Sequence, residues 1–352
     1  MRALAAAGAE VTLFCYGSGE GAAPEDLEVV RVPGFLSSRV LRAGPTVSKP
    51  LADAALAARF AAEARSRHFD VALAHNAEAA LAALLVRPAT RVPVIYVAHT
   101  LLANELDAYV LSELSEPARR VGQHLDAGVA SRADGVLTLC SAAAIRLRAQ
   151  AQGPVTVIPP GLYPQPAPSA ESVERICVRA GVEPGHFALY TGNVDRYQDL
   201  ESLAGAARLL PELPIVVATH GDRDAPDRGL RSIRTRPEEA RALLFACAAA
   251  VLPRRRQGGF PIKLLNYMEA RRAIVARARL VDGLEHGVSA WLVPPEAGPR
   301  ELATALETLA GDPVAAAKLG RGARSLLELR HSWPPLAKQT LEFMEEVVLH
   351  AR

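Results

Sequence analysis

The residues best suited to chemistry lie in the stretch Arg254–Ala276, RRRQGGFPIKLLNYMEARRAIVA. An apolar run ends at Pro253, two glycines follow at Gly258-Gly259, and apolar residues then recur at helical spacing. The pattern predicts a strand, a glycine turn, a helix and a second strand. We expect the helix to begin at Pro261, where the missing N–H costs nothing, so that its free amides point back at the glycine turn. Amides arranged in this way bind anions.

Positive charge is concentrated near this turn. The chain has only four lysines, and Lys263 falls in the first turn of the expected helix. From Arg223 to Arg256 the sequence carries nine arginines against four acidic residues. These arginines form either a wall facing a phosphorylated ligand or an ordinary solvated face. Lys263 is open to the same two interpretations, a phosphate contact or a solvated lysine in a βαβ turn.

The totals exclude several classes of protein. With 352 residues, half of them apolar, the chain is long enough for two domains with buried cores. A formal net charge of +2 gives no support for nucleic-acid binding. No apolar run approaches the roughly 20 residues that span a bilayer, and the first residues are too short and too weakly charged for a signal peptide. Four cysteines without metal-ligand spacing indicate reduced thiols in a cytoplasmic protein.

The apolar segments do not alternate with polar residues, and helical patterns separate them. This pattern predicts parallel strands covered on both faces, as in a doubly wound α/β domain. It occurs in both halves of the chain, and the proline-rich segment 159–168 is expected to join the two domains. The expected strands are 11–16, 27–32, 69–74, 92–98, 135–139 and 155–158 in the first half, and 187–191, 215–218, 248–252 and 273–276 in the second.

Helix limits are expected at a few recognisable residues. A long helical region after residue 100 is expected to break near Pro117. Ser141 and Asp199 are the residue types that cap the helices beginning beside them.

The beginning of the chain is unusual for this architecture. Residues 1–7 read as the end of a helix that Gly8 terminates, and the strand 11–16 follows. No strand precedes this helix, although the first strand of a doubly wound sheet is central and its loss would leave a hole in the core. We therefore expect that the sequence starts one βα unit late. A naturally short form is the alternative.

Ligands of open α/β sheets bind beyond the carboxyl ends of the strands. Two such domains facing each other would enclose a cleft lined by these ends, where small-molecule sites concentrate. His220 and His286 are expected to be structural. The residues at the expected strand ends are His75, His99, Ser141 and Gly161 in the first half, and Gly192, His220 and Gly258-Gly259 in the second.

Five segments in this order resemble the GT-B fold glycosyltransferases of family 4, also called group 1, which are retaining and use nucleotide sugars. The resemblance covers nearly the whole chain and fits two Rossmann-like domains that face a central cleft. The segments are VTVIPPG at 155–161, LYTGNVDRYQDL at 189–200, GFPIKLLNYMEA at 259–270, EHGVSAWLVP at 285–294, and Ser332-Trp333 with the final helix.

The resemblance implies a domain plan and an activity. Residues 1–163 would form the acceptor-side domain, residues 164–331 the nucleotide-sugar domain, and residues 332–352 a helix crossing back to the first. The implied activity is hexosyl-type transfer from a nucleotide sugar to a glycan, a lipid or a small acceptor, with retention and without metal or cofactor. The donor-binding positions carried over are Gly192, Asn193, Gln198, Arg256, Gly258, Gly259, Phe260, Pro261, Lys263 and Asn266.

Four of those positions depart from the family pattern. Where the family has two glutamates separated by seven residues, this chain has Gly258 and Asn266. Where the phosphate loop has an arginine and a lysine, it has Asn193 and Gln198. A hydrogen bond to a charged acceptor contributes about 1.5–3 kcal/mol of stabilisation, and one to a neutral acceptor about 0.5–1.5 kcal/mol. Asn266 could therefore still hold the ribose, more weakly. The family's glycine-rich loop after the first strand is also absent.

Because the family's two phosphate-binding cations are missing, we hypothesise that cations at other positions of this chain bind the diphosphate, which we call the relocation hypothesis. A diphosphate leaving group develops charge that preorganised cations stabilise. We expect Lys263 to take the diphosphate together with one or more nearby arginines and the amides after Gly259. The arginines considered are Arg254, Arg255, Arg256 and Arg196.

On the acceptor side the resemblance implies roles for three strand-end residues and one close to them. His99 would hydrogen-bond the transferred sugar and help polarise the reacting centre, and the alternative is a histidine that caps a turn. His75, Asn76 and Glu78 are candidates for contacts with the acceptor, with ordinary structural roles as the alternative. No enzyme nucleophile is required for same-face attack.

Two other functions and one further partner remain open from the sequence. A degenerate member would bind a ligand or partner without catalysis, as the missing glutamates and cations suggest. Epimerisation of a sugar nucleotide would need acidic residues around the sugar carbon, and the strand ends offer few. Basic helical segments at 59–67 and at Arg119-Arg120 could contact anionic lipid, and a solvated helix face is the alternative.

Overall fold

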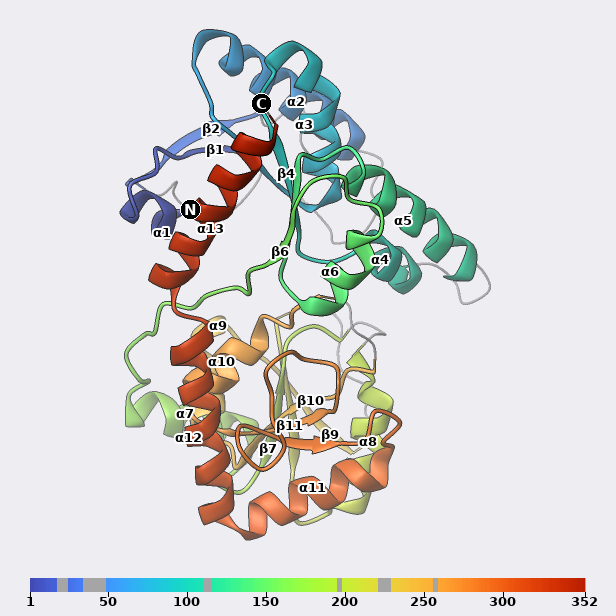
Figure 1. Ribbon diagram of the computed structural model, residues 1–352. Helices are drawn as coiled ribbons and strands as arrows, with labels where there is room; N and C mark the ends of the chain where they lie inside the picture. The colour runs from blue at the N-terminus through green and yellow to red at the C-terminus, as the bar shows by residue number, and fades with distance from the viewer. Residues whose placement is uncertain are drawn as a thin grey trace. The chain divides into compact units, whose positions relative to one another are not determined.

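A computed structural model describes residues 1–17, 25–33, 49–109, 115–194, 198–220, 229–255 and 259–351. The chain divides into two compact units (Figure 1). Unit 1 contains Met1–Pro160, Gly258–Phe260 and Trp333–Arg352. Unit 2 contains Gly161–Gln257 and Pro261–Ser332.

Unit 1 holds two parallel sheets. In the first, β1 (Thr12–Cys15) pairs with β2 (Glu28–Arg31). In the second, the strands lie in the order β3 (Ala72–His75), β4 (Val94–Ala98), β5 (Gly135–Thr138) and β6 (Val155–Val157). All residues of β4 and β5 are buried, as expected for apolar strands with helices on both faces.

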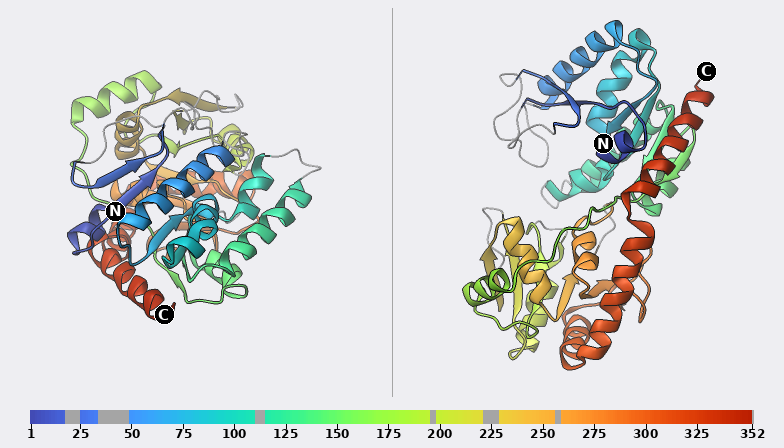
Figure 2. Two further views of the ribbon diagram at one scale, coloured as in Figure 1. Left: turned by 90° about the horizontal axis from the view of Figure 1, so that it is seen from above. Right: turned by 90° about the vertical axis from the view of Figure 1, so that its left-hand side faces the viewer.

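The helices of unit 1 surround these sheets, and the C-terminal helix packs beside the first one (Figures 1 and 2). The carboxylate of Asp126 accepts hydrogen bonds from the amides of Leu102 and Ala103, which ties α5 to the start of α4. The helices are α1 (Arg2–Ala6), α2 (Lys49–Ser66), α3 (Asn76–Thr90), α4 (Leu102–Tyr109), α5 (Ser115–Ala130), α6 (Ser141–Arg148) and α13 (Trp333–His350).

The expected division of the helical region near Pro117 is confirmed, since α4 ends at Tyr109 and α5 begins at Ser115, and Pro117 lies in the first turn of α5, where proline is tolerated. One expected helix limit in unit 1 was wrong. Ser141 is the first residue of α6, whose N-cap is Cys140, and no side-chain hydrogen bond caps that helix.

Unit 2 is built on one six-stranded parallel sheet with the order β12, β11, β10, β7, β8, β9. The order reverses between β7 and β10, which makes this point the topological switch where doubly wound sheets bind ligands. The predicted α/β class with parallel sheets is confirmed. The strands are β7 (Ala188–Thr191), β8 (Ile215–Thr219), β9 (Leu230–Arg234), β10 (Ala249–Leu252), β11 (Ala273–Arg277) and β12 (Trp291–Val293).

Helices cover both faces of this sheet. Asp199 caps α8 as predicted, because its carboxylate accepts a hydrogen bond from the amide of Ser202. The expected start of the central helix was wrong by two residues: α10 begins at Lys263, and a tight turn from Pro261 precedes it. The helices are α7 (Ala170–Ala180), α8 (Leu200–Leu209), α9 (Pro237–Ala246), α10 (Lys263–Glu269), α11 (Pro299–Gly311) and α12 (Pro313–Arg330).

Among the described residues, no helix is both long enough and apolar enough to cross a bilayer.

Candidate active site

A cavity of about 720 Å³ opens in unit 2 at the carboxyl ends of β7 and β8. The starts of α9 and α10 and the segment after Gly161 complete its walls. Three of the predicted donor-binding residues line it together, namely Gly192, Lys263 and Asn266. His220, at the end of β8, lines it as well. The cavity therefore lies beside the switch point of the sheet.

Lys263 is fixed at the inner wall of this cavity. Its ammonium donates a hydrogen bond to the hydroxyl of Tyr190 at 2.7 Å and lies 4.1 Å from the centre of that ring. Gly192 makes room for it, because a Cβ atom there would come within 2.6 Å of Nζ. The backbone of Gly192 has φ of +130°, a conformation that favours glycine. The glycine and the lysine thus depend on each other.

Tyr267 joins the two strands at the switch point. Its hydroxyl accepts a hydrogen bond from the amide of Thr191 at 3.1 Å and donates to the carbonyl of Val251 at 3.4 Å. The side chain is fully buried, and burial raises the pKa of Tyr267 to about 12. The α10 helix therefore holds the ends of β7 and β10 at a fixed spacing below Lys263.

The two polar residues that replace the family's phosphate-loop cations contact each other. Gln198 is buried and donates a hydrogen bond to the side-chain oxygen of Asn193 at 3.2 Å. The backbone carbonyl of Asn193 accepts from the hydroxyl of Tyr190 at 2.5 Å. Neither side chain lines the cavity that Lys263 lines. They stabilise the loop after β7.

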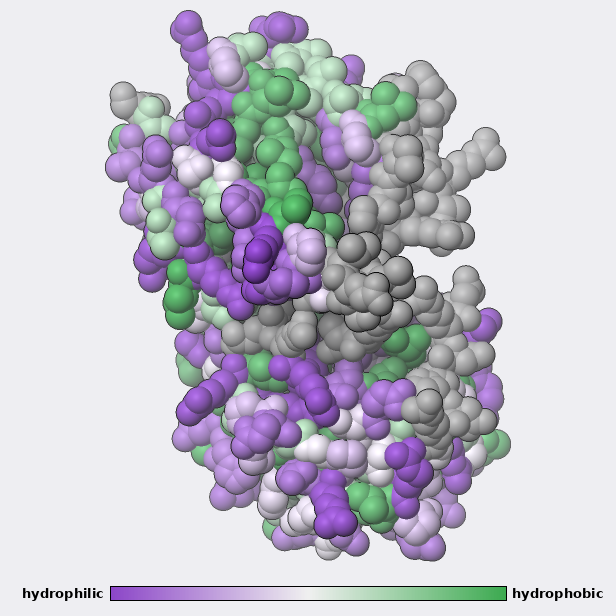
Figure 3. Space-filling view, turned by 90° about the vertical axis from the view of Figure 1, so that its right-hand side faces the viewer, coloured by the Kyte–Doolittle hydropathy of each residue, from purple (hydrophilic) through white to green (hydrophobic). Residues whose placement is uncertain are grey.

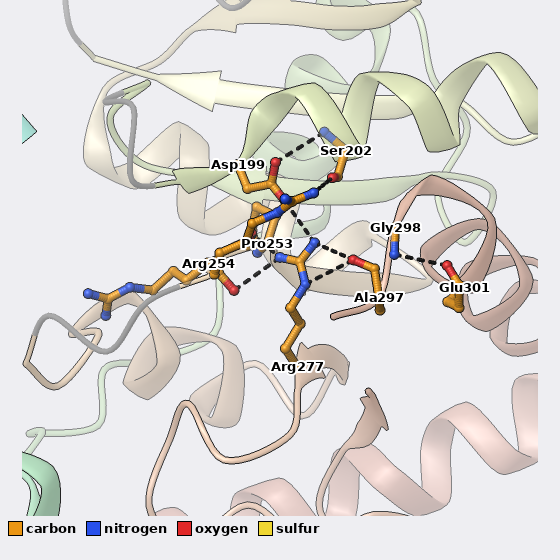
Figure 4. Close-up of polar contacts among 9 residues, drawn as sticks. Asp199, Ser202, Pro253, Arg254, Arg277, Ala297, Gly298 and Glu301 are labelled. Carbon is orange, nitrogen blue, oxygen red and sulfur yellow. Dashed lines mark hydrogen bonds and ion pairs between the residues drawn. The ribbon is translucent and has the colours of Figure 1, made fainter. Parts of the chain in front are cut away.

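A buried ion network underlies the same loops (Figure 4). The guanidinium of Arg277 has no exposed surface and lies 2.6 Å from the carboxylate of Asp199. Arg255 lies at the same distance from that carboxylate. Arg277 also donates hydrogen bonds to the backbone carbonyls of Pro253, Arg254 and Ala297.

This network changes two expectations. Arg255, one of the relocated cations considered above, is paired with Asp199 and Ser202. Arg277 did not figure in the sequence prediction. A charged residue directly after the wholly apolar run 273–276 was the signal that could have identified it.

The remaining donor-side positions lie partly outside the described residues. Arg256, Gly258 and Arg196 are among those outside. Arg254 is buried. Phe260 and Pro261 are described and buried. Gly259 has φ of +101°. A Cβ atom on Gly259 would lie 2.3 Å from the carbonyl oxygen of His99, within unit 1.

Glu269 was also missed, and it anchors another wall of the cavity. Its carboxylate accepts hydrogen bonds from the amide of Gln165 at 2.7 Å and from Nε of Arg241 at 3.2 Å. Arg241 in turn donates to the carbonyls of Gln165 and Pro166. The segment at 165–166 is thereby held against α10, and Gln165, Arg241 and Glu269 all line the cavity.

Two other arginines that line the cavity are paired with an acid. Arg236 and Arg179 both contact the carboxylate of Glu239 at the start of α9. The Arg179 guanidinium is the main cause that holds the pKa of Glu239 at about 2. This side of the cavity is polar, with fixed donors and acceptors.

On unit 1, the structure brings His75 and His99 into direct contact. Their strands are neighbours, and Nδ1 of His75 lies 2.7 Å from Nε2 of His99. Surrounding protein, followed by repulsion from His99 and from the amine of Met1, lowers the pKa of His75 to about 4. Burial also lowers the pKa of His99. One proton between the two facing nitrogens makes a neutral pair, in which the position of that proton sets the tautomer of His99.

Stability is expected to fall in acid because of this pair. An unfolded chain protonates these rings near pH 6.5, whereas in the folded chain the pKa of His75 is lowered to about 4 and that of His99 is lowered as well. The stability that the neutral pair contributes is therefore present above pH 6.5 and lost as the pH falls towards 4. We expect Tm, measured from pH 7.5 to 4, to fall less steeply for His75→Asn than for the wild type. The same substitution at the exposed His124 should leave the slope unchanged, and equal slopes for all three proteins would contradict the prediction.

The other two acceptor-side candidates flank this pair. Asn76 is exposed and starts α3 with φ of +68°, which asparagine tolerates. Glu78 lies 3.6 Å from the ammonium of Lys49. His286, expected to be structural, accepts a hydrogen bond from the amide of Leu292 at 3.0 Å.

Models of known protein families match the residues of both the histidine pair in unit 1 and the cavity in unit 2. A glycosyl transferase 4-like domain model matches residues 1–161. A model of the glycosyl transferases group 1 matches residues 185–312, which include the cavity with Gly192 and Lys263. The chain belongs to the group 1 GT-B glycosyltransferases. No curated protein sequence matches this group 1 glycosyltransferase.

Solved structures share the fold of this group 1 glycosyltransferase at low sequence identity. Sucrose-phosphate synthase from Thermosynechococcus elongatus is 19% identical, with 99% of this chain and 91% of that chain covered and a TM-score of 0.76. HepE of Anabaena, in complex with UDP-glucose, is 19% identical over 91% and 86%, with a TM-score of 0.67. WaaG, a glycosyltransferase involved in lipopolysaccharide biosynthesis, is 14% identical over 97% and 93%, with a TM-score of 0.67.

Proposed function

We propose that this protein transfers a hexosyl group from a nucleotide sugar to a glycan, lipid or small-molecule acceptor, with retention and without a metal ion or cofactor. The observation that carries the proposal is the position of Lys263. Its ammonium lies against Gly192 at the switch point of the sheet, in a cavity that Asn266 also lines. A cation, a glycine backbone and a polar amide around one cavity match the parts of a nucleotide diphosphate.

In this proposal Lys263 binds the diphosphate. The ammonium donates to the hydroxyl of Tyr190 and carries the positive charge that attracts phosphate oxygens. Departure of the nucleoside diphosphate adds negative charge to those oxygens, and a fixed cation stabilises that charge most in the transition state. Of the arginines in the relocation hypothesis, Arg255 is paired with Asp199, while Arg196 and Arg256 lie outside the described residues.

Asn266 would contact the ribose from the next turn of α10. It lies three residues after Lys263, and side chains at this spacing share one face of a helix. The amide oxygen accepts a ribose hydroxyl in place of the family's carboxylate. The polar wall at Arg236 and the segment held by Glu269 would then face the nucleobase and the sugar–phosphate region.

His99 would serve the transferred sugar. With one nitrogen bonded to His75, its Nδ1 remains for a hydroxyl of the sugar. The acceptor hydroxyl forms the new bond to the anomeric carbon on the face from which the diphosphate leaves, and its proton passes to the leaving phosphate oxygen. His75, Asn76 and Glu78 would orient the acceptor, and no enzyme nucleophile takes part.

The relatives support a uridine nucleotide as the first donor to test, because HepE was solved with UDP-glucose and with UDP. Thermal unfolding should be measured with UDP, GDP, ADP and their glucose conjugates. A ligand at 100 times its Kd stabilises the protein by about 2.7 kcal/mol, which raises Tm by several degrees. The expected result is a rise with one nucleotide in the wild type that is much smaller in Lys263→Met.

Turnover then separates the enzyme from a degenerate binding protein. Release of the nucleoside diphosphate should be followed with the stabilising donor and a panel of sugar and lipid acceptors. Acceptor-dependent release supports the transferase. A Tm rise without release, with any acceptor, would support the alternative of binding without catalysis. No Tm rise with any nucleotide would overturn the proposal.

We also propose a cytoplasmic location. Two surface features of unit 1 concern its possible contact with a membrane. Apolar side chains gather on one face of unit 1 (Figure 3). Three of the basic residues suggested for lipid contact are paired within their own helices, Arg59 with Glu63 and both Arg119 and Arg120 with Glu116. Arg67 is paired with Glu28 of β2. This pairing favours a solvated face over electrostatic attraction to anionic lipid. Sedimentation with anionic vesicles tests it, and binding that 0.5 M salt abolishes would restore the lipid contact.

A further inference from the structure

The two histidines at the carboxyl ends of β3 and β4 are held in one arrangement. In the register of the sheet, His75 lies opposite Val97. His99 follows Val97 by two residues, and side chains at this spacing point to the same face of a strand. The two rings therefore meet on one face, with 5.0 Å between their centres and 2.7 Å between Nδ1 of His75 and Nε2 of His99.

The backbone of His99 is held as well. Gly259 lies so close to it that a Cβ atom there would come within 2.3 Å of the carbonyl oxygen of His99 and 3.1 Å of the hydroxyl of Thr100. This contact belongs to unit 1. With its backbone held, the direction of the His99 ring depends on two side-chain torsions, and the contact with His75 fixes them.

One proton lies between the two facing nitrogens. Two protons would place two N–H donors against each other, and no proton would leave two lone pairs in contact. Desolvation lowers the pKa of both histidines, that of His75 to about 4, so both rings are neutral at pH 7. The shared proton therefore belongs either to Nδ1 of His75 or to Nε2 of His99.

These two arrangements differ in their tautomers. If Nδ1 of His75 is the donor, both neutral rings carry their proton on Nδ1. If Nε2 of His99 is the donor, both rings carry it on Nε2. Nε2 lies farther from the electron-withdrawing backbone and is the more basic nitrogen of a histidine side chain, which favours the second arrangement. Because His75 is exposed, water can accept a hydrogen bond from its Nε2–H.

We propose that His75 is a positioning residue for sugar transfer, which accepts the Nε2 proton of His99 and so leaves Nδ1 of His99 unprotonated to accept a hydrogen bond from a hydroxyl of the transferred sugar. This inference rests on the proposed function, in which His99 serves that sugar. It also describes the substrate further. The sugar presents an O–H donor to His99, and a methyl ether at that position has no proton to donate.

The tautomer can be measured by NMR on the full chain with ¹⁵N-labelled histidines. Protonated and unprotonated imidazole nitrogens differ in chemical shift, and the signals that disappear in His99→Gln belong to His99. The expected result at pH 7.5 is a protonated Nε2 and an unprotonated Nδ1 for His99. A protonated Nδ1 of His99 would overturn the proposal. This readout requires no sugar transfer, so it decides the tautomer even if the proposed function fails.

Two substitutions of His75 test the positioning role. Asparagine offers its Oδ1 on Cγ, where histidine carries Nδ1, and can accept the same proton, whereas leucine cannot. With the glucose conjugate that raises Tm, kcat/KM is expected to fall about tenfold or more in His75→Leu and to stay within about threefold of the wild type in His75→Asn. His124→Leu, at an exposed position of α5, is the matched control and should leave kcat/KM unchanged.

The NMR spectra of the variants complete the test. His99 should keep its tautomer in His75→Asn and show signals of both tautomers in His75→Leu. Equal losses of kcat/KM in the two variants, or a changed tautomer in His75→Asn, would overturn the positioning role. If His75→Leu does not fold, the tautomer of His99 in the wild type and in His75→Asn decides the question.

Discussion

Replacing Lys263 by methionine is expected to lower kcat/KM for sugar transfer by about 100- to 1000-fold, the usual cost of removing one preorganised donor from a developing charge. Methionine retains an unbranched apolar side chain and removes the ammonium. The contact with Tyr190 and the space above Gly192 show that this ammonium is held in one place before any ligand binds. A group that is already oriented stabilises the leaving diphosphate without reorganisation.

The measurement is the initial rate of nucleoside diphosphate release over a range of donor concentrations at a saturating acceptor. Lys318→Met serves as the matched control, because this lysine is exposed on α12. Lys263→Arg should recover part of the activity, since it restores the charge with a different geometry. Activity of Lys263→Met within threefold of the wild type would show that another group carries the diphosphate.

Replacing Asp199 by asparagine is expected to lower the free energy of unfolding of unit 2 by about 3–5 kcal/mol, the usual cost of leaving one member of a buried ion pair without its partner. The Arg277 guanidinium has no exposed surface, so water cannot replace the lost carboxylate. Asparagine tolerates the positive φ of +45° at this position and can still cap α8. The substitution therefore isolates the charge.

Urea denaturation can report on unit 2 alone. The chain has two tryptophans, and in a Trp333→Phe background Trp291 of β12 provides the only indole signal. The double variant Asp199→Asn/Arg277→Leu should lose less stability than Asp199→Asn, because it removes the buried charge together with its partner. A loss of unfolding free energy below 1 kcal/mol for Asp199→Asn would contradict the prediction. It would mean that the carbonyls around Arg277 are enough to stabilise its buried charge.

The strands that the sequence predicted best are those whose residues are all buried. The runs at 215–218 and 273–276 fall within β8 and β11, every residue of which is buried. Strand β9 was missed, because three of its five residues are exposed and two of them are arginines. An edge strand exposed to water carries no apolar run, and hydrophobic patterning alone does not identify it.

The candidate site was predictable where it depends on the order of the strands. Gly192 was expected at one strand end and Lys263 in the first turn of the helix that follows another, and parallel strands bring such ends to one edge of the sheet. The partner of Arg255 was not predictable, because Asp199 lies 56 residues away and was expected only to cap a helix. Patterns of residue type indicate which groups are charged, and the three-dimensional path of the loops decides which of them are neutralised.

Two contacts in unit 1 also could not be predicted from residue types. They are the contact of Gly259 with the backbone of His99 and the hydrogen bond between His75 and His99. Adjacent strands made proximity of His75 and His99 foreseeable from the order of the sheet, but the shared hydrogen bond depends on both ring orientations.

The Arg277 network also determines how this enzyme can be re-engineered. One guanidinium ties together the loop after β7, the loop after β10 and the segment before α11, through Asp199, Pro253 and Ala297. A loop grafted singly from a relative would replace one of these three acceptors while the buried Arg277 and the other two loops stay unchanged. Donor specificity is therefore expected to transfer between relatives only when all three loops are exchanged as a set.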